Sequence, residues 1–326
     1  MDVASFCRQS RVLMVAGKGG VGKSTMVAAL ARMAASAGLS VLIVELEGKP
    51  GIATAFGRRD QLGYEESLLA APTGPGAGAV RGRRITPDDA LLEYLSDHGL
   101  HRVSKRLLSA GVLDVVSTAI PGIRDVLVLG KVKGLERDGV ADLILVDAPA
   151  TGHAVTFLTS AGGLLRIARS GPVHTQAAEV DELLRDAARC RVVLVTLAEE
   201  MPVSETVQAA YQLEDRAGMR LGPVIVNGVA GLPPGLARSD AAAAARAAGI
   251  RCTDEQMEAL DAARLFRLRR AGLEAEQLAR LGRELPLPQL RVPALPVPFI
   301  GPTQLGALSD ALARGVGDLV PEVPAP

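Results

Sequence analysis

The sequence predicts an α/β fold with a doubly wound, mostly parallel sheet and a small helical subdomain insert. Two observations carry this prediction. Short apolar runs alternate with Ala- and Leu-rich helical segments along the 326 residues, which is typical of consecutive βαβ units. A Gly-rich loop lies directly between the first apolar run and the first helical segment, where such folds place a ligand-binding turn.

The first βαβ unit opens the chain. The apolar run 11–16 predicts a buried strand, residues 24–37 predict a helix closed by Gly38, and residues 40–45 predict a second strand. Further strands are predicted at 143–146, 191–197, 223–227 and 292–297, and further helices at 87–96, 174–189, 203–217, 253–283 and 303–315.

A single domain, 1–326, is expected. The Gly/Pro-rich stretch 71–84 predicts a flexible loop. The helical subdomain insert is predicted at about 87–137, beginning with Thr86 as N-cap of a helix that carries acidic residues in its first turn.

Composition excludes several function classes. Lys+Arg and Asp+Glu are both 36, so neither a nucleic-acid partner nor an anionic membrane surface is expected. No apolar run approaches the roughly 18 residues that span a bilayer, and the N-terminus lacks a signal-peptide pattern, which predicts a cytoplasmic protein. The three cysteines, Cys7, Cys190 and Cys252, form no CxxC pair, so neither a disulfide framework nor a zinc site is expected.

The Gly-rich loop fits the pattern GxxxxGK[ST] between a strand and a helix, which predicts a site for Mg·ATP. Its glycines let backbone N–H groups converge on phosphate oxygens at a helix N-terminus. Lys23 is expected to contact the β- and γ-phosphates, Ser24 to ligate Mg²⁺, and Thr25 to touch the α-phosphate. The alternative is a turn without a ligand. The loop comprises Gly17, Lys18, Gly19, Gly20, Val21, Gly22, Lys23, Ser24 and Thr25.

A second lysine, Lys18, follows the first glycine of this loop. Here the sequence resembles the deviant Walker A ATPases, a group that includes MinD, ParA, the nitrogenase iron protein and the ArsA/Get ATPases. The resemblance implies that Lys18 reaches across a dimer interface to the partner's nucleotide, with the logic of an arginine finger. The alternative is an exposed loop lysine.

The segment Val146–His153 (VDAPATGH) resembles the DTAPTGH switch II segment of the ArsA/Get family. The resemblance implies that Asp147 holds Mg²⁺ through a water, and that Gly152 and His153 respond to the γ-phosphate. The sequence departs from the family at Ala148, where Thr is usual, and at Ala150, where Pro is usual.

Other segments extend the resemblance from about residue 11 to about 315. Residues 119–125 (AIPGIRD) resemble a helix start of the family's helical subdomain, and 194–205 resemble its strand-loop-helix after switch II. The strand at 224–228 (VIVNG) implies that Asn227 contacts adenine. Pro298 and Phe299 fall where an adenine-covering loop is expected, although an ordinary loop fits equally well.

Switch I departs most from the family, which has an Asp-Pro pair there to position the attacking water. Alignment on Ala55-Phe56 places Glu47, a longer carboxylate, at the family's Asp, with Pro50 nearby. Glu47 is expected to orient water with altered geometry, so that hydrolysis is slow or partner-dependent. The alternatives are a solvated loop charge, or Glu45 in that role.

The leading hypothesis is an ArsA-like ATPase that binds ATP and Mg²⁺, whose dimer opens and closes with hydrolysis and is coupled to a transport or membrane-protein partner. The resemblance implies a homodimer or a heterodimer with a paralogous ATPase. Arsenite control is not expected, because As(III) is thiophilic and Cys190, the thiol next to a core strand, is predicted to be buried.

Two rival hypotheses remain. The first is a nucleotide-switched targeting or chaperone-like protein that binds hydrophobic clients in a groove formed by the apolar residues of 100–137; the alternative for these residues is core packing. The second is a positioning ATPase of the ParA/MinD type. Against it stand the balanced charge and the missing C-terminal amphipathic helix.

Overall fold

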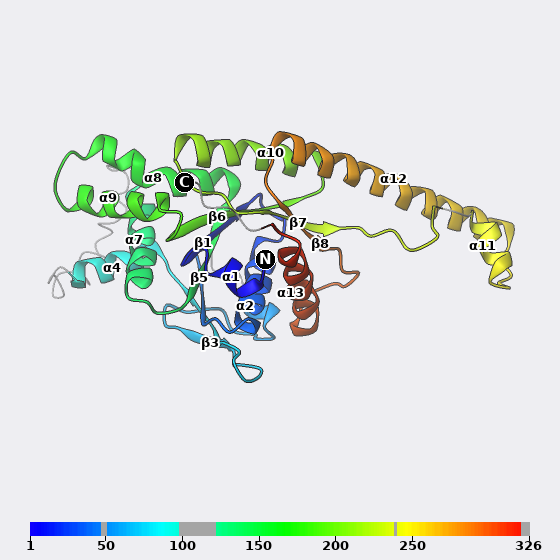
Figure 1. Ribbon diagram of the computed structural model, residues 1–326, viewed down its shortest axis with the longest axis horizontal. Helices are drawn as coiled ribbons and strands as arrows, with labels where there is room; N and C mark the ends of the chain where they lie inside the picture. Colours follow the sequence, from blue (N-terminus) through cyan, green and yellow to red (C-terminus); the bar gives the residue numbers. More distant parts are fainter. Residues whose placement is uncertain (47–50, 98–121, 238–239, 321–326) are drawn as a thin grey trace.

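The computed structural model describes residues 1–46, 51–97, 122–237 and 240–320 (Figure 1). An eight-stranded sheet lies at its centre, in the order β3-β4-β2-β5-β1-β6-β7-β8. All neighbouring strands are parallel except β3 and β4, which confirms the predicted α/β class. The strands are β1 (Val12–Gly17), β2 (Val41–Glu45), β3 (Ser67–Ala70), β4 (Val80–Arg84), β5 (Leu143–Ala150), β6 (Cys190–Leu197), β7 (Val224–Val229) and β8 (Gln289–Pro293).

Helices cover both faces of the sheet, and each face has its own apolar core. One core joins the sheet to α1 (Val3–Cys7), α2 (Lys23–Ser36), α3 (Gly51–Ala55) and α13 (Pro302–Gly317). The other joins it to α7 (Ile123–Arg137), α8 (Thr151–Ile167), α9 (Pro172–Arg185), α10 (Glu200–Tyr211), the π-helical turn η1 (Gln212–Arg216) and the end of α12 (Asp254–Glu284). The remaining described helices are α4 (Pro87–Asp97) and α11 (Ala241–Ala247).

The central strands β1 and β2 are apolar except for Glu45, because they are covered on both faces. Every residue of β1 and β2 is buried, so their sequences show continuous rather than alternating apolar character. The helix α2 then ends as predicted, since Gly38 has φ +93°, a left-handed conformation that continues no α-helix.

The predicted flexible loop 71–84 is wrong at its end, because Val80–Arg84 forms strand β4 between β2 and β3. Its sequence, VRGRR, contains no apolar run, so the pattern did not predict a strand. Arg81 is neutralised by Glu66 at 2.6 Å, and Arg83 lies over the ring of Tyr64, 4.5 Å from its centroid. Gly82 is needed where the side chain of Leu69 approaches, since a Cβ there would lie 2.7 Å from Leu Cδ1. Sequence patterns identify a covered strand by a run of apolar residues, and the arginines of β4 interrupt any such run.

Two other elements differ from their sequence patterns. The last strand is β8 at Gln289–Pro293, earlier than the predicted 292–297, because its residues alternate between buried and accessible positions instead of forming a run. The helix α8, which follows switch II, was not predicted. The helices at 87–96 and 253–283 are confirmed as α4 and α12, and the Thr86 hydroxyl accepts from the backbone N–H of Asp89 at 3.2 Å, as an N-cap does.

The long helix α12 leaves the body of the protein (Figure 1). It begins with a capping box formed by Thr253 and Gln256. Near its C-terminal end Leu278 and Leu281 are buried in the core. We call residues 241–273, which comprise α11 and the part of α12 beyond the body, the arm. None of the described helices combines the length and apolar character that a bilayer crossing requires.

The central strand β5 is expected to govern stability. Leu145 is fully buried there, so Leu145→Ala leaves a cavity and should lower the free energy of unfolding by about 2–5 kcal/mol. Val320→Ala is the control, because Val320 is 85% exposed and its truncation should change stability by less than about 0.5 kcal/mol. Urea denaturation measures both. Equal effects of the two substitutions would contradict the assignment of Leu145 to the core.

Candidate functional site

The Gly-rich loop lies at the carboxyl end of β1, between β5 and β6, and leads directly into α2. Gly20 and Gly22 have φ of +87° and +89°, which only glycine adopts without strain. Gly17 is packed against β6, since a Cβ there would lie 2.2 Å from the carbonyl oxygen of Val195. The loop therefore wraps the N-terminus of α2 as a phosphate-binding loop does.

Ser24 and Asp147 meet at the centre of this edge. The Ser24 hydroxyl donates to the Oδ2 atom of Asp147 at 2.5 Å. Parallel pairing explains the contact, because β1 and β5 are in register with Val15 beside Asp147, so both chains leave the sheet side by side. A serine hydroxyl beside a buried carboxylate is a donor set that suits Mg²⁺, which prefers oxygen ligands.

Lys18 does not extend freely from the loop. Its ammonium group lies 2.7 Å from the Oε1 atom of Glu205 on α10, and both side chains are about one-third exposed. Sequence reasoning did not single out Glu205, although it lies in the segment 194–205 that follows switch II. No local signal marked it, because Glu199 and Glu200 are carboxylates of the same helix start and only the fold shows which one meets Lys18.

Asn227, the predicted adenine contact, lies at the carboxyl end of β7 and touches the loop. Its side-chain amide donates to the carbonyl of Val21 at 2.9 Å, and a Cβ on Gly22 would lie 2.4 Å from the same nitrogen. Asn227 is thus brought to the site. Pro298 and Phe299 are exposed in the loop between β8 and α13, and within the described residues neither is hydrogen-bonded to the phosphate-binding loop. Their role stays a prediction.

The switch II residues open the helix α8. Gly152 has open space around it, and His153 is exposed. His153 acts electrostatically on Asp125 of α7: burial raises the pKa of the Asp125 carboxyl above its ordinary range, and the nearby imidazole partly opposes this. The segment 119–125 therefore meets switch II through Asp125, a residue that sequence reasoning quoted without giving it a role.

The switch I prediction falls partly outside the described residues. Glu47 and Pro50 lie there, so their roles stay predictions. Glu45 is the last residue of β2, buried and in register with Asp147, which shows that it closes the strand. Gly51, which opens α3, lies beside Ser24, since a Cβ on Gly51 would be 3.7 Å from Ser24 Cβ. The chain after switch I thus returns to Ser24, the predicted Mg²⁺ ligand.

Comparison with known proteins agrees with this geometry. Residues 10–168, which contain the loop, Ser24 and Asp147, match the anion-transporting ATPase (ArsA) family. The chain belongs to this family. It is 40% identical over 226 residues to ATPase BagA of Mycobacterium tuberculosis, an alignment covering 67% of this chain and 64% of that relative.

More distant relatives lie in the same family. The chain is 28% identical over 223 residues to an arsenical pump-driving ATPase of Escherichia coli, covering 66% of this chain and 34% of that protein. It is 28% identical over 146 residues to ATPase get3 of Schizosaccharomyces japonicus, covering 45% of this chain and 42% of that protein. The chain thus spans less than two-thirds of the length of each of these relatives.

The cysteines of this family member are poorly placed for metalloid chemistry. Burial raises the pKa of the Cys7 and Cys190 thiols to about 12, so both stay protonated at neutral pH. Cys190 is buried, as predicted, at the start of β6. Cys252 is partly exposed and carries a free thiol. A thiolate, not a thiol, is the metal ligand, so the buried pair cannot serve as one without local opening.

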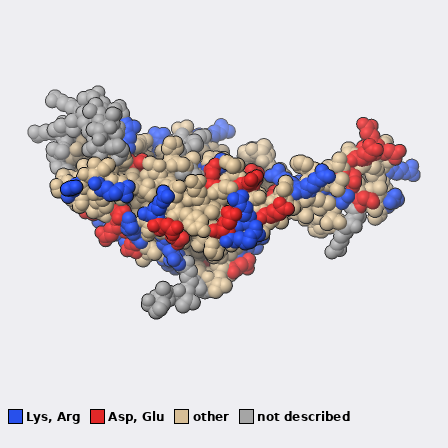
Figure 2. All heavy atoms as spheres, turned by 90° about the horizontal axis from the view of Figure 1, so that it is seen from above, with Lys and Arg blue, Asp and Glu red and all other residues tan. Residues whose placement is uncertain are grey.

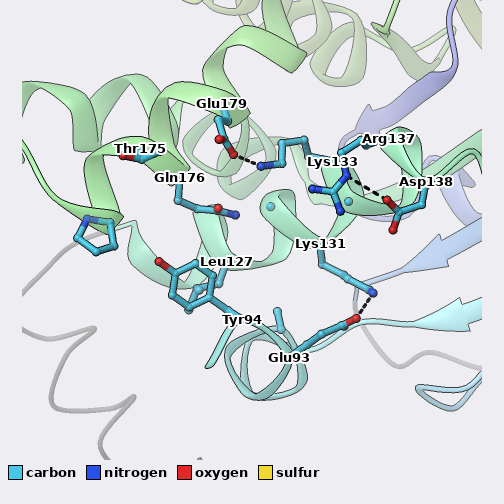
Figure 3. A pocket seen from close by; sticks show the side chains of 14 residues that line it. Glu93, Tyr94, Leu127, Lys131, Lys133, Arg137, Asp138, Thr175, Gln176 and Glu179 are labelled. Atoms are coloured by element: carbon cyan, nitrogen blue, oxygen red, sulfur yellow. Dashed lines mark hydrogen bonds and ion pairs between the residues drawn. The ribbon is translucent and has the colours of Figure 1, made fainter. Parts of the chain in front are cut away.

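A cavity of about 720 Å³ lies between α4, α7 and α9 (Figure 3). Its walls are charged. Lys131 is paired with Glu93 and Lys133 with Glu179, so each pair ties α7 to a neighbouring helix. The apolar residues Val126–Leu129 of α7 are buried in the core, and of these Leu127 also lines the cavity. For this part of 100–137 core packing is therefore correct; residues 98–121 lie outside the described part of the chain.

Gly17 is expected to tolerate no side chain. In Gly17→Ala the new Cβ would meet the Val195 carbonyl at 2.2 Å, so β1 and β6 must separate, with an expected loss of about 1–3 kcal/mol of stability. Gly19→Ala is the matched control, because the nearest atom to its Cβ is 3.9 Å away, and its stability should change by less than about 0.5 kcal/mol. Thermal unfolding without nucleotide measures both. Equal melting temperatures for the two variants would refute the close approach.

Asp125 is expected to make stability depend on pH. Its raised pKa means that the folded state favours the protonated carboxyl, so its stabilising contribution is complete at acid pH and is lost as pH rises through the folded-state pKa. Asp125→Asn mimics the protonated form, so its stability relative to wild type should increase as pH rises above about 4, the ordinary pKa of an aspartate. Urea titrations across this range measure the difference, with Asp318→Asn as an exposed control. A difference that stays constant, or falls with pH, would contradict the burial of this carboxyl.

Proposed function

We propose that this protein hydrolyses ATP with Mg²⁺ and that its dimer opens and closes during the cycle. The observation that carries the proposal is the Ser24–Asp147 contact at the head of α2, directly after a glycine loop shaped for phosphates. Lys23 would neutralise the β- and γ-phosphates there. Ser24, and Asp147 through a water, would hold Mg²⁺, which supplies further charge neutralisation to the transferred group.

Lys18 would act on the nucleotide of the second subunit. In the single chain it is held by Glu205, so closing the dimer would exchange a carboxylate partner for phosphate oxygens. This exchange costs little free energy, because the ion pair is partly exposed and solvent already screens it. Glu47 would position the attacking water, and its extra methylene relative to Asp would make hydrolysis slow.

Switch II would transmit the nucleotide state to the helical subdomain. Asp147 and His153 lie at the two ends of one short segment, and His153 acts on Asp125 at the start of α7. A change in the position of His153 would alter the environment of the partly buried Asp125 carboxyl and so bias α7. We infer that this movement drives a transport or membrane-protein partner, as the likeness to a pump-driving ATPase suggests. The charged wall of the described subdomain cavity favours this over a hydrophobic-client groove.

A mixing experiment tests the proposal. Lys18→Ala and Lys23→Ala are each expected to be inactive in phosphate release, for different reasons: the first binds Mg·ATP but lacks the lysine given in trans, and the second lacks the lysine given in cis. An equal mixture should recover about a quarter of the wild-type rate, because half of its dimers are mixed and each mixed dimer has one complete site.

The controls separate the parts of the proposal. Asp147→Ala should not complement Lys23→Ala, because both residues act in their own chain's site: in a mixed dimer one site lacks Asp147 and the other lacks Lys23, so neither is complete. Light scattering with and without Mg·ATP measures dimer formation in parallel. Activity of Lys23→Ala alone at the wild-type rate would refute the ATPase assignment. Failure of the mixture to recover any activity while each variant still dimerises would refute the role of Lys18 in trans.

A further inference from the structure

The arm exposes more apolar surface than an isolated helical pair would be expected to show. Residues 250–273 carry large apolar side chains that face solvent, among them Phe266 at 64% and Leu273 at 61% exposed. The full set is Ile250, Leu260, Leu265, Phe266 and Leu273. Exposed apolar groups gathered on one protruding element mark an interaction site.

Charge is separated along the same helix. The first two turns of α12 are acidic, and the following turns are basic up to Arg270. Figure 2 shows charged side chains of both signs along the arm, including at its far end. Asp261 and Arg264 pair with each other, as do Arg270 and Glu274. Within the described residues no ion pair engages Asp254, Glu255, Glu258, Arg267 or Arg269.

The two sides of α12 differ. Asp261 and Arg264 face α11 and its preceding loop: the Asp261 carboxylate accepts from the backbone N–H of Ala241 at 3.4 Å, and Arg264 donates to the carbonyl of Leu236 at 3.5 Å. The opposite side is exposed and repeats every seven residues, as a helix that packs on another helix does. Its members are Glu255, Ala259, Ala262, Phe266, Arg269 and Leu273.

We propose that this outer side of the arm pairs antiparallel with the same side of a second copy of the chain. Ala262 is the centre: Glu255 stands seven residues before it and Arg269 seven after, so a twofold axis at Ala262 places each Glu255 opposite Arg269 of the second copy. The acidic and basic segments then face each other twice. The alanines at 259, 262 and 263 allow the helices to approach closely, and Phe266 is covered on each side of the axis.

This pairing differs from the nucleotide-dependent dimer of the proposed function. It involves no residue of the phosphate-binding loop and needs no ATP, so the two contacts fail or succeed independently. An interface of two helices is small, which makes it weak and concentration-dependent. Its specificity comes from the self-complementary charge, since a parallel arrangement would set like charges against each other.

A charge-swap series tests the proposal on the full chain without nucleotide. Glu255→Arg and Arg269→Glu each set like charges together and should weaken self-association at least about tenfold in sedimentation velocity. The double variant Glu255→Arg with Arg269→Glu restores opposite charges and should recover association to within about threefold of wild type. Arg283→Glu, near the body on the same helix, is the control and should leave association unchanged. Loss in both single variants without recovery in the double would overturn the proposed register.

A cross-link locates the axis. In a Cys252→Ser background, Ala262→Cys should form a disulfide dimer under mild oxidation without ATP, because the two cysteines face each other at the axis. Ala279→Cys, also exposed, lies 17 residues away and would be about 50 Å from its counterpart, so it should not cross-link. Adding Lys23→Ala to the Ala262→Cys protein should leave its cross-linking unchanged, which separates this contact from the ATP site. Equal cross-linking at 262 and 279, or a monomer that instead sediments with anionic vesicles, would overturn the proposal.

Discussion

The parallel register of β1 against β5 is the constraint on which the rest of the site depends. It sets Val15 beside Asp147, so the phosphate-binding loop and switch II leave the sheet at the same point and Ser24 reaches Asp147 at 2.5 Å. The pairing is secured by burial on both faces, because the helices of each layer cover these strands completely. A slip of one residue would turn every core side chain to the opposite face, so the register is strongly specified.

Around this edge lie charged groups that join the loop and switch II to neighbouring helices. Lys18 is held on Glu205 by a partly exposed ion pair, and His153 acts electrostatically on the partly buried carboxyl of Asp125. Both contacts join the loop or switch II to helices outside the sheet, and neither is strong enough to lock the molecule in one state. A rigid sheet with weakly held charged groups at its carboxyl edge is what a nucleotide-driven cycle requires.

The two sides of the arm differ in how they are satisfied within the chain. Its inner side is satisfied by α11 and by hydrogen bonds to Ala241 and Leu236, while its outer side leaves Phe266 and several charges in solvent. Folding alone does not explain that outer pattern, because an exposed helix is stable without apolar residues there. The proposed antiparallel pairing about Ala262, in which acidic and basic side chains of two copies meet, accounts for this exposed pattern.

Local chemistry in the sequence determined the phosphate-binding loop, Asp147, the central strands and the long helix, because glycine spacing, apolar runs and caps act within a few residues. The strand β4 escaped prediction because its arginines are satisfied by Glu66 and Tyr64, which neighbouring elements supply. Only the tertiary structure decided that Lys18 meets Glu205, that Asn227 touches Val21, and that Asp125 lies near His153. These contacts join residues distant in sequence, so their energy depends on packing that no local pattern encodes.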